Sequence, residues 1–362
     1  MTEIAKKEPR RLELDALRGF AALSVLWYHY TTGFGEKFGH ADPIWCPFPV
    51  GHHGVTLFFM ISGFVILMTL DRCKAPMDFV VARFARLYPA YWVAVLLTFA
   101  VVSACGLPER EHDVTTLLVN LTMIQGLFRF PNVDGVYWSL LSELLFYGLI
   151  WGVVTIGFRK RLNAVFVALI AVGLVFSVAQ LYPFVPLSHG MDLLLFRHLH
   201  LFFVGIVLYQ MRSGMRARHG ALLAVCLLAA IVRRTSWLDA GAFSLLAAAV
   251  FLASCRRTRL LTVRPLVFFG TISYPLYLLH QYLGYVVIRA GYERGWNGNV
   301  SVAAASAIAI LVASILTFTI ERPANVWLRA KYKQWKAGRS AAPVVEAAIG
   351  APGTTGDCRT PL

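Results

Sequence analysis

The feature that most limits the fold is a series of apolar stretches long enough to cross a lipid bilayer. A membrane-spanning helix needs about 20 predominantly apolar residues. With 58% hydrophobic and only 15% charged residues and a mean hydropathy of +0.63, the chain lies far from a soluble average. We therefore predict an all-α, polytopic membrane bundle of about ten transmembrane helices. The expected spans are 13–33, 53–70, 87–105, 136–157, 162–181, 197–211, 219–233, 238–254, 266–288 and 300–320.

The segments outside these spans predict a single membrane domain with short tails. Residues 1–11 are polar and basic, and the apolar run behind them lacks a small-residue cleavage site, so the first span is expected to be retained. The apolar stretch 114–130 is expected to be re-entrant or interfacial. We assign residues 12–335 to the membrane domain. Residues 336–362, rich in Ala, Pro, Gly and Thr towards the end, are expected to form a disordered tail.

The distribution of basic residues predicts the orientation of the bundle. If the N-terminus is cytoplasmic, 26 of the 34 Lys and Arg residues fall in cytoplasmic segments, in accord with the excess of positive charge on that side of membrane proteins. Both termini are then cytoplasmic. The net charge of +15 is explained by this orientation. Nucleic-acid binding is not indicated, because it would need a basic face on a soluble domain, and the sequence offers none.

Cysteine and histidine spacing does not predict a metal site. The six cysteines contain no C-x-x-C pair, so neither a zinc site nor a disulfide framework is indicated. A bridge between Cys46 and Cys105 remains an alternative. His52 and His53 are adjacent in the sequence, at the outer mouth of the second span, and two such residues do not make a metal site by themselves.

The first span carries two ionisable residues on one predicted helix face. Arg18 and His29 are 11 residues apart, which on a helix is about three full turns and roughly 16 Å along the axis. Ionisable residues inside a membrane are costly and mark functional sites by default. The pair therefore predicts a polar path through the bundle.

Several motifs, taken in their order along the chain, give a resemblance to a known family. The chain resembles acyltransferase family 3, integral membrane proteins that O-acylate surface polysaccharides, lipopolysaccharide and related glycans. The resemblance runs from about Leu12 to Pro323. It rests on Arg18-x10-His29, Gly51-His-His-Gly54-Val-Thr-Leu-Phe-Phe-Met-Ile-Ser62-Gly63-Phe64, Arg83-Phe-Ala-Arg86-Leu-Tyr-Pro89, Tyr137-Trp138-Ser139-Leu-Leu-Ser-Glu143-Leu-Leu-Phe146-Tyr147, Ile272-Ser-Tyr-Pro-Leu-Tyr277-Leu-Leu-His280 and Ile320-Glu321-Arg-Pro323.

The resemblance implies the reaction and the partners. An acyl group, acetyl by preference, would move from acyl-CoA as co-substrate to a hydroxyl of a glycan or lipid-linked saccharide, with no permanently bound cofactor and no metal. The protein would lie in the bacterial inner membrane, possible partners including glycan assembly machinery. Thr56 stands where many relatives carry Asp, which weakens any role for a carboxylate there. A fused esterase-like domain, present in some members, is not expected.

His29 and three arginines are the first candidate site residues. His29 is the expected catalytic base for a hydroxyl proton, although a packed histidine and a covalent acyl carrier are alternatives. Arg18 is expected to bind the acyl-CoA donor, or else to pair with Asp15 at the membrane edge. Arg83 and Arg86, one turn apart before Pro89, are expected to bind the CoA phosphates, although the charge bias of cytoplasmic ends also predicts arginines here.

Glu143 is the second expected catalytic residue, within an apolar fourth span. A carboxylate there needs a partner, and it could orient His29, hold the acceptor, or tie two helices together. Less specific candidates for acceptor binding or for lining the site are Trp138, Ser139, Tyr277 and His280. Ser62 and Gly63 favour close helix packing. A serine nucleophile is not indicated, because the sequence contains no G-x-S-x-G motif.

Two other function classes are compatible with charged residues in membrane helices. A proton-coupled transporter or flippase of a glycan or small metabolite also uses intramembrane Arg, His and Glu. It predicts inverted repeats and interrupted helices in matching halves, and the sequence has neither. A structural subunit of a polysaccharide export complex would give no reason for Arg18 and His29 to share a face.

Overall fold

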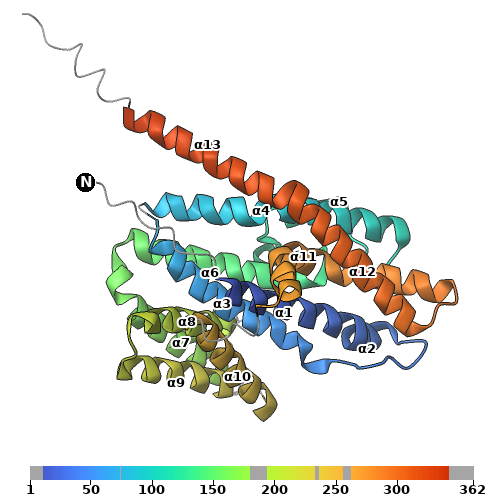
Figure 1. Cartoon of the computed structure of the whole chain (residues 1–362), viewed down its shortest axis with the longest axis horizontal. Helices are drawn as coiled ribbons and strands as arrows, with labels where there is room; N and C mark the ends of the chain where they lie inside the picture. The colour runs from blue at the N-terminus through green and yellow to red at the C-terminus, as the bar shows by residue number, and fades with distance from the viewer. Residues whose placement is uncertain (1–10, 74, 180–193, 233–235, 256–261, 342–362) are drawn as a thin grey trace, which may run out of the picture.

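The structure is a computed structural model that describes residues 11–73, 75–179, 194–232, 236–255 and 262–341 (Figure 1). Throughout these ranges the regular structure is helical and no strand occurs. Within these ranges, six helices are long and apolar enough to cross a membrane. The prediction of a polytopic, all-α membrane bundle is therefore confirmed.

The helices follow the predicted spans closely. The short stretch predicted to be re-entrant, 114–130, contains only one helix of 7 residues and a 3-10 turn, so it is not a full span. The helices are α1 Leu12–Tyr28, α2 Phe34–Phe38, α3 His53–Leu70, α4 Pro76–Cys105, α5 Val114–Asn120, α6 Trp138–Thr155, α7 Leu162–Ala179, α8 Leu194–Gln210, α9 Ala217–Val232, α10 Trp237–Ser254, α11 Arg264–Glu293, α12 Gly298–Leu316 and α13 Arg322–Ala341.

The helices form two groups on either side of the central helices α1 and α11. α7, α8, α9 and α10 pack on one another on one side, while α4, α12 and α13 lie on the other (Figure 1). Between them, α1 packs most extensively on α11, and α3 on α8. Buried apolar side chains of α1, α3, α4, α6 and α8 form one continuous core. This arrangement places α1, the helix with Arg18, at the centre of the bundle.

Two sequence-based boundaries and one alternative cysteine pairing need correction. α13 continues to Ala341, so the predicted disordered tail does not begin at residue 336; residues 342–362 lie outside the described part. Cys46 and Cys105 are free thiols, which rules out the alternative of a bridge between them here. The third span begins at Pro76, 11 residues before the predicted start at 87, because Pro76 lacks the N–H that a first helical turn leaves unpaired.

Pro89 consequently lies inside α4, not at the beginning of a helix as predicted. An internal proline cannot donate to the carbonyl four residues earlier, which here belongs to Ala85. The Asn325 side chain of α13 donates a hydrogen bond of 3.1 Å to the Ala85 carbonyl oxygen. Tertiary packing thus provides the partner that the proline removes, and α4 continues through it.

Two π-helical turns interrupt the spans at functionally notable places. His29–Gly33 joins α1 to α2, and Thr317–Glu321 joins α12 to α13. A π-turn widens the helix by one residue and changes the direction of the side chains within it. The second turn ends two residues before Pro323, whose ring would clash with the carbonyl four residues earlier in a regular helix. His29 and Glu321 each lie in one of these turns.

Glycines bring the central helices into backbone contact. A Cβ added at Gly270 of α11 would lie 1.9 Å from the Asp15 carbonyl oxygen of α1, and one added at Gly63 of α3 would lie 1.9 Å from the Phe202 carbonyl oxygen of α8. Small residues allow such close approach in membrane bundles. The prediction that Gly63 serves helix packing agrees with this contact.

Gly63→Ala should therefore destabilise the protein. The new methyl group must push α3 away from α8, at a cost of about 1–3 kcal/mol for overpacking. Thermal unfolding of the detergent-purified protein measures the effect. Gly148→Ala on α6 is the matched control, since a Cβ there meets nothing within 4 Å. Equal changes in melting temperature for both variants would contradict the proposed contact.

Candidate functional site

A narrow internal cavity gathers the three arginines predicted to bind the donor. The cavity, called here the arginine cavity, has a volume of about 80 Å³. Arg18 enters it from α1, and Arg83 and Arg86 enter it from α4. A cavity of this size and polarity has room for several water molecules. Its other polar lining residues are Ser62, Ser139, Glu143, Tyr147, Ser273, Tyr274 and Tyr277.

A second, larger cavity contains His29 and is called here the histidine cavity. Its volume is about 510 Å³, within the range of small-molecule sites. Most of its polar lining comes from α1, α3, α8 and α10. Thr56 also lines it. The remaining polar and aromatic lining residues include Tyr28, His52, His53, Trp138, Arg197, His198, His200 and Asp239.

The two cavities adjoin one another. Val55, Phe59 and Tyr277 line both of them. Arg18 and His29, on one helix, therefore face two neighbouring cavities separated by these shared side chains. The predicted polar path along α1 has its structural counterpart in this pair of cavities.

His29 is almost enclosed by residues of α11. Its Nδ1 lies 3.2 Å from Gln281 Nε2 and 3.3 Å from the Tyr285 hydroxyl. The His280 ring lies beside it, with 5.0 Å between ring centroids. A Cβ at Gly33 would lie 3.3 Å from His29 Nδ1, so glycine in the π-turn leaves room for the imidazole.

Gln281 and Tyr285 are site residues that the sequence reasoning missed. Both follow the Ile272–His280 motif, and Gln281 and His280 are almost fully buried, at 2% and 1% exposure. A buried glutamine one residue beyond a motif of tyrosines and a histidine is the signal that was available. His280 itself lies in the interior of α11, because the helix continues through Pro275 to Glu293.

Glu143 does not contact His29. It lines the arginine cavity, where it accepts a hydrogen bond of 2.6 Å from the Ser62 hydroxyl and another from the Tyr147 hydroxyl. Among its three expected roles, the structure contains the tie between helices, here α6 and α3. The expectation that Glu143 orients His29 is not met, since the polar neighbours of the imidazole come from α11.

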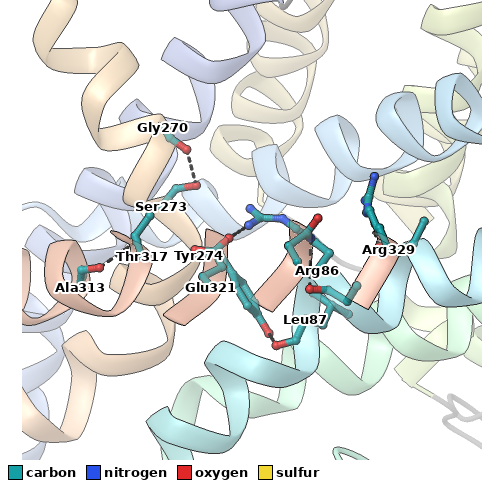
Figure 2. Close-up of polar contacts among 12 residues, drawn as sticks. Arg86, Leu87, Gly270, Ser273, Tyr274, Ala313, Thr317, Glu321 and Arg329 are labelled. Atoms are coloured by element: carbon teal, nitrogen blue, oxygen red, sulfur yellow. Dashed lines mark hydrogen bonds and ion pairs between the residues drawn. The ribbon is translucent and has the colours of Figure 1, made fainter. Parts of the chain in front are cut away.

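Arg86 is paired with a carboxylate from the far end of the chain. The guanidinium forms an ion pair with Glu321, whose side chain is only 3% exposed, and Figure 2 shows the two groups pointing towards one another from α4 and the π-turn. Arg86 also lies over the Tyr274 ring, 5.3 Å from its centroid. The Tyr274 hydroxyl in turn donates to the Leu87 carbonyl oxygen at 3.0 Å. Glu321 belongs to a recognised motif but was not among the predicted site residues.

Arg83 differs from Arg86 in its polar partners. Its guanidinium lies 3.3 Å from the Thr69 hydroxyl and 5.8 Å from the Tyr147 ring centroid. In the part of the chain that the structure describes, no carboxylate forms an ion pair with it. The two arginines of the R-x-x-R motif thus have different surroundings, and Arg83 keeps more of its charge available to a ligand.

The less specific candidates lie at the border of the two cavities. Tyr277 lines both and its hydroxyl lies 2.7 Å from the Ser139 hydroxyl. Trp138 lines the histidine cavity and lies against His198, with ring centroids 5.1 Å apart. His280 is buried behind His29 and does not appear in the lining of either cavity.

A bundle of membrane-spanning helices with charged residues around two adjoining cavities defines a polytopic membrane protein with a polar site between its helices. A model of the acyltransferase domain of family 3 matches residues 11–319. The chain belongs to this family and is an acyltransferase.

Curated relatives include proteins of polysaccharide metabolism. The chain is 30% identical over 148 residues to the exopolysaccharide production protein ExoZ of Rhizobium meliloti, covering 38% of this chain and 44% of ExoZ. It is 30% identical over 166 residues to protein 2 of the picA locus of Rhizobium radiobacter, covering 39% of this chain and 82% of that protein. A Bacillus subtilis protein, provisionally named peptidoglycan O-acetyltransferase YrhL, is 31% identical over 140 residues. The match covers 37% of this chain and 18% of YrhL.

The matched stretch thus spans less than half of ExoZ and less than a fifth of YrhL. No solved structure matches the chain significantly.

Loss of the Glu321 carboxylate should cost more stability than loss of Arg83. Glu321→Gln leaves the Arg86 guanidinium without its counter-charge, and breaking such a buried pair costs about 3 kcal/mol or more. Arg83→Gln removes no ion pair and should cost about 1 kcal/mol or less. Thermal unfolding in detergent compares the two. The pairing would be refuted by a Glu321→Gln variant as stable as the parent protein.

Proposed function

We propose that this protein is an O-acyltransferase of the bacterial inner membrane that moves an acetyl group from acetyl-CoA to a hydroxyl of a cell-surface or exported glycan. The observation that carries the proposal is that Arg18 and His29, on one helix, face two adjoining cavities. One cavity is narrow and basic, and the other is larger and rich in histidine. The names of ExoZ and YrhL support a glycan acceptor.

The donor is assigned to the arginine cavity. Arg18 and Arg83 offer guanidinium groups that suit phosphate oxygens, while Arg86 is held by Glu321. The cavity is too small for a whole coenzyme, so the nucleotide would remain outside and the extended arm would enter. The excess of Lys and Arg on the predicted cytoplasmic side supports entry of the donor from the cytoplasm.

The acceptor is assigned to the histidine cavity. Its volume of about 510 Å³ accommodates a sugar, and the Trp138 ring in its lining offers an aromatic contact for a sugar ring. Tyr277 and Phe59, which line both cavities, mark the place where a thioester from one side meets a hydroxyl from the other. His29 lies next to this border.

The transfer needs one base. His29 Nε2 takes the proton of the acceptor hydroxyl as its oxygen attacks the thioester carbonyl carbon. The carbon–sulfur bond then breaks, and the departing CoA thiolate takes the proton from His29. The new bond is an ester between the acetyl group and the glycan. A covalent acetyl-His29 intermediate is the alternative course, detectable as label that stays on the denatured protein.

Gln281 would hold His29 in the form that this step requires. A base at Nε2 needs the ring proton on Nδ1, and Nδ1–H needs an acceptor. The Gln281 amide nitrogen lies 3.2 Å from Nδ1, and the amide oxygen has no hydrogen-bond partner. A half-turn of the amide would bring this oxygen to Nδ1, where it would accept the proton. Gln281 is thus proposed as a positioning residue.

Binding of radiolabelled acetyl-CoA to the detergent-purified protein tests the assignment of the two cavities. Arg18→Ala should weaken binding about tenfold or more, since it removes a phosphate partner. His29→Ala should bind acetyl-CoA normally but transfer no label to a glycan acceptor. No binding to any folded form would exclude CoA as the donor.

Gln281→Leu should lower kcat about tenfold or more while leaving the KM for acetyl-CoA unchanged, because it acts on the orientation of His29 and not on donor binding. Steady-state transfer assays measure both constants. A parallel rise in KM with unchanged kcat would place Gln281 in substrate binding instead.

A further inference from the structure

Three side chains at the edge of the histidine cavity come together from two distant helices. His52 and His53 lie where the chain enters α3, and Asp239 lies in the first turn of α10. Their potential ligand atoms all lie within 4.8 Å of one another. His52 is exposed and the other two are half-buried, so the cluster lies where the cavity meets the surface. We propose that these three residues bind a divalent transition-metal ion, with Zn²⁺ as the best fit.

The spacing of the ligand atoms fits one metal ion. His53 Nε2 and Asp239 Oδ1 are 3.2 Å apart. Zinc–nitrogen and zinc–oxygen bonds of about 2.0–2.2 Å in a tetrahedral arrangement place two ligand atoms about 3.3 Å apart. The neighbouring His52 ring, with its centroid 4.1 Å from that of His53, offers the third ligand.

The hydrogen bonds around the cluster leave the correct atoms available. His52 Nδ1 lies 2.7 Å from the Pro49 carbonyl oxygen. A carbonyl only accepts, so Nδ1 carries the proton and Nε2 keeps its lone pair for a metal. Asp239 Oδ2 accepts from the Ser236 backbone N–H at 2.9 Å, which leaves Oδ1 for the ion. Such outer hydrogen bonds are what orients ligands in metal sites.

The backbone holds the three ligands in place without a metal. Gly51 and Gly54 flank the histidine pair, and Cβ atoms there would lie 2.4 Å and 2.5 Å from the Ser24 and Ala21 carbonyl oxygens of α1. The pair is therefore packed directly on the helix that carries His29. Asp239 is fixed by the reciprocal cap with Ser236, whose hydroxyl accepts from the Asp239 N–H at 3.1 Å.

The chemistry of the ligand set points to zinc. Two imidazoles and one carboxylate are the ligands of several zinc sites that keep a fourth position open. Here the open position faces the histidine cavity, because all three residues line it. A metal there would bind an oxygen of an incoming glycan, a role that rests on the function proposed above. Metal binding itself does not depend on that function.

Zinc binding to the full-length, detergent-purified protein without a polyhistidine tag tests the proposal. Zn²⁺ alone is the probe, with the bound metal counted after desalting and the affinity measured by competition with a chromophoric chelator. We expect about one equivalent for the parent protein, and an affinity reduced about tenfold or more in His53→Ala and in Asp239→Asn. The asparagine keeps an oxygen for the Ser236 N–H, so the start of α10 is preserved.

Two further measurements make the result decisive. His112→Ala, in the loop between α4 and α5, is the matched histidine control and should bind zinc like the parent. Co²⁺ should give visible absorption typical of tetrahedral nitrogen and oxygen ligands in the parent but not in Asp239→Asn. No stoichiometric zinc in the folded parent, or equal binding by all variants, would overturn the site and leave a plain His53–Asp239 ion pair. Zinc binding without acetyl-CoA binding would retain the site and refute the proposed donor.

Discussion

The arrangement of this bundle depends on finding partners for charged side chains among apolar helices. An ionised group buried without a counter-charge is costly, and Arg86 meets this constraint through Glu321 (Figure 2). That single pair joins α4 to the π-turn between α12 and α13. Asn325, four residues after Glu321, donates a hydrogen bond to the Ala85 carbonyl oxygen. This bond also joins α13 to α4. The position of the α4 arginines is thus set by the last helices of the chain.

The second organising element is close contact between backbones at glycine. Gly19 of α1 and Gly270 of α11 meet the carbonyl oxygens of Leu266 and Asp15, respectively, with no room for a Cβ. These contacts fix α1 against α11 and so bring Gln281 to His29. The catalytic proposal therefore depends on packing at residues that take no part in the chemistry. Enzymes commonly hold a reactive group by such surrounding structure.

In the proposed mechanism, the two cavities divide the work along α1. The basic one suits a polyanionic donor, and the larger one, with its histidines and its proposed metal position, suits an acceptor rich in hydroxyl groups. Their shared lining of Val55, Phe59 and Tyr277 is the place where two substrates would meet. Separate chambers for two substrates also limit the access of water to the thioester, which favours transfer over hydrolysis.

The sequence by itself determined the membrane class and most helix positions, because hydropathy and helical periodicity are local properties. Only the tertiary structure decided which polar groups meet. Glu143 faces Ser62 instead of His29, Glu321 holds Arg86, and Asp239 reaches the pair His52–His53. These contacts join residues 81 to 235 positions apart in the chain. No local pattern encodes such pairing, since it depends on how whole helices pack.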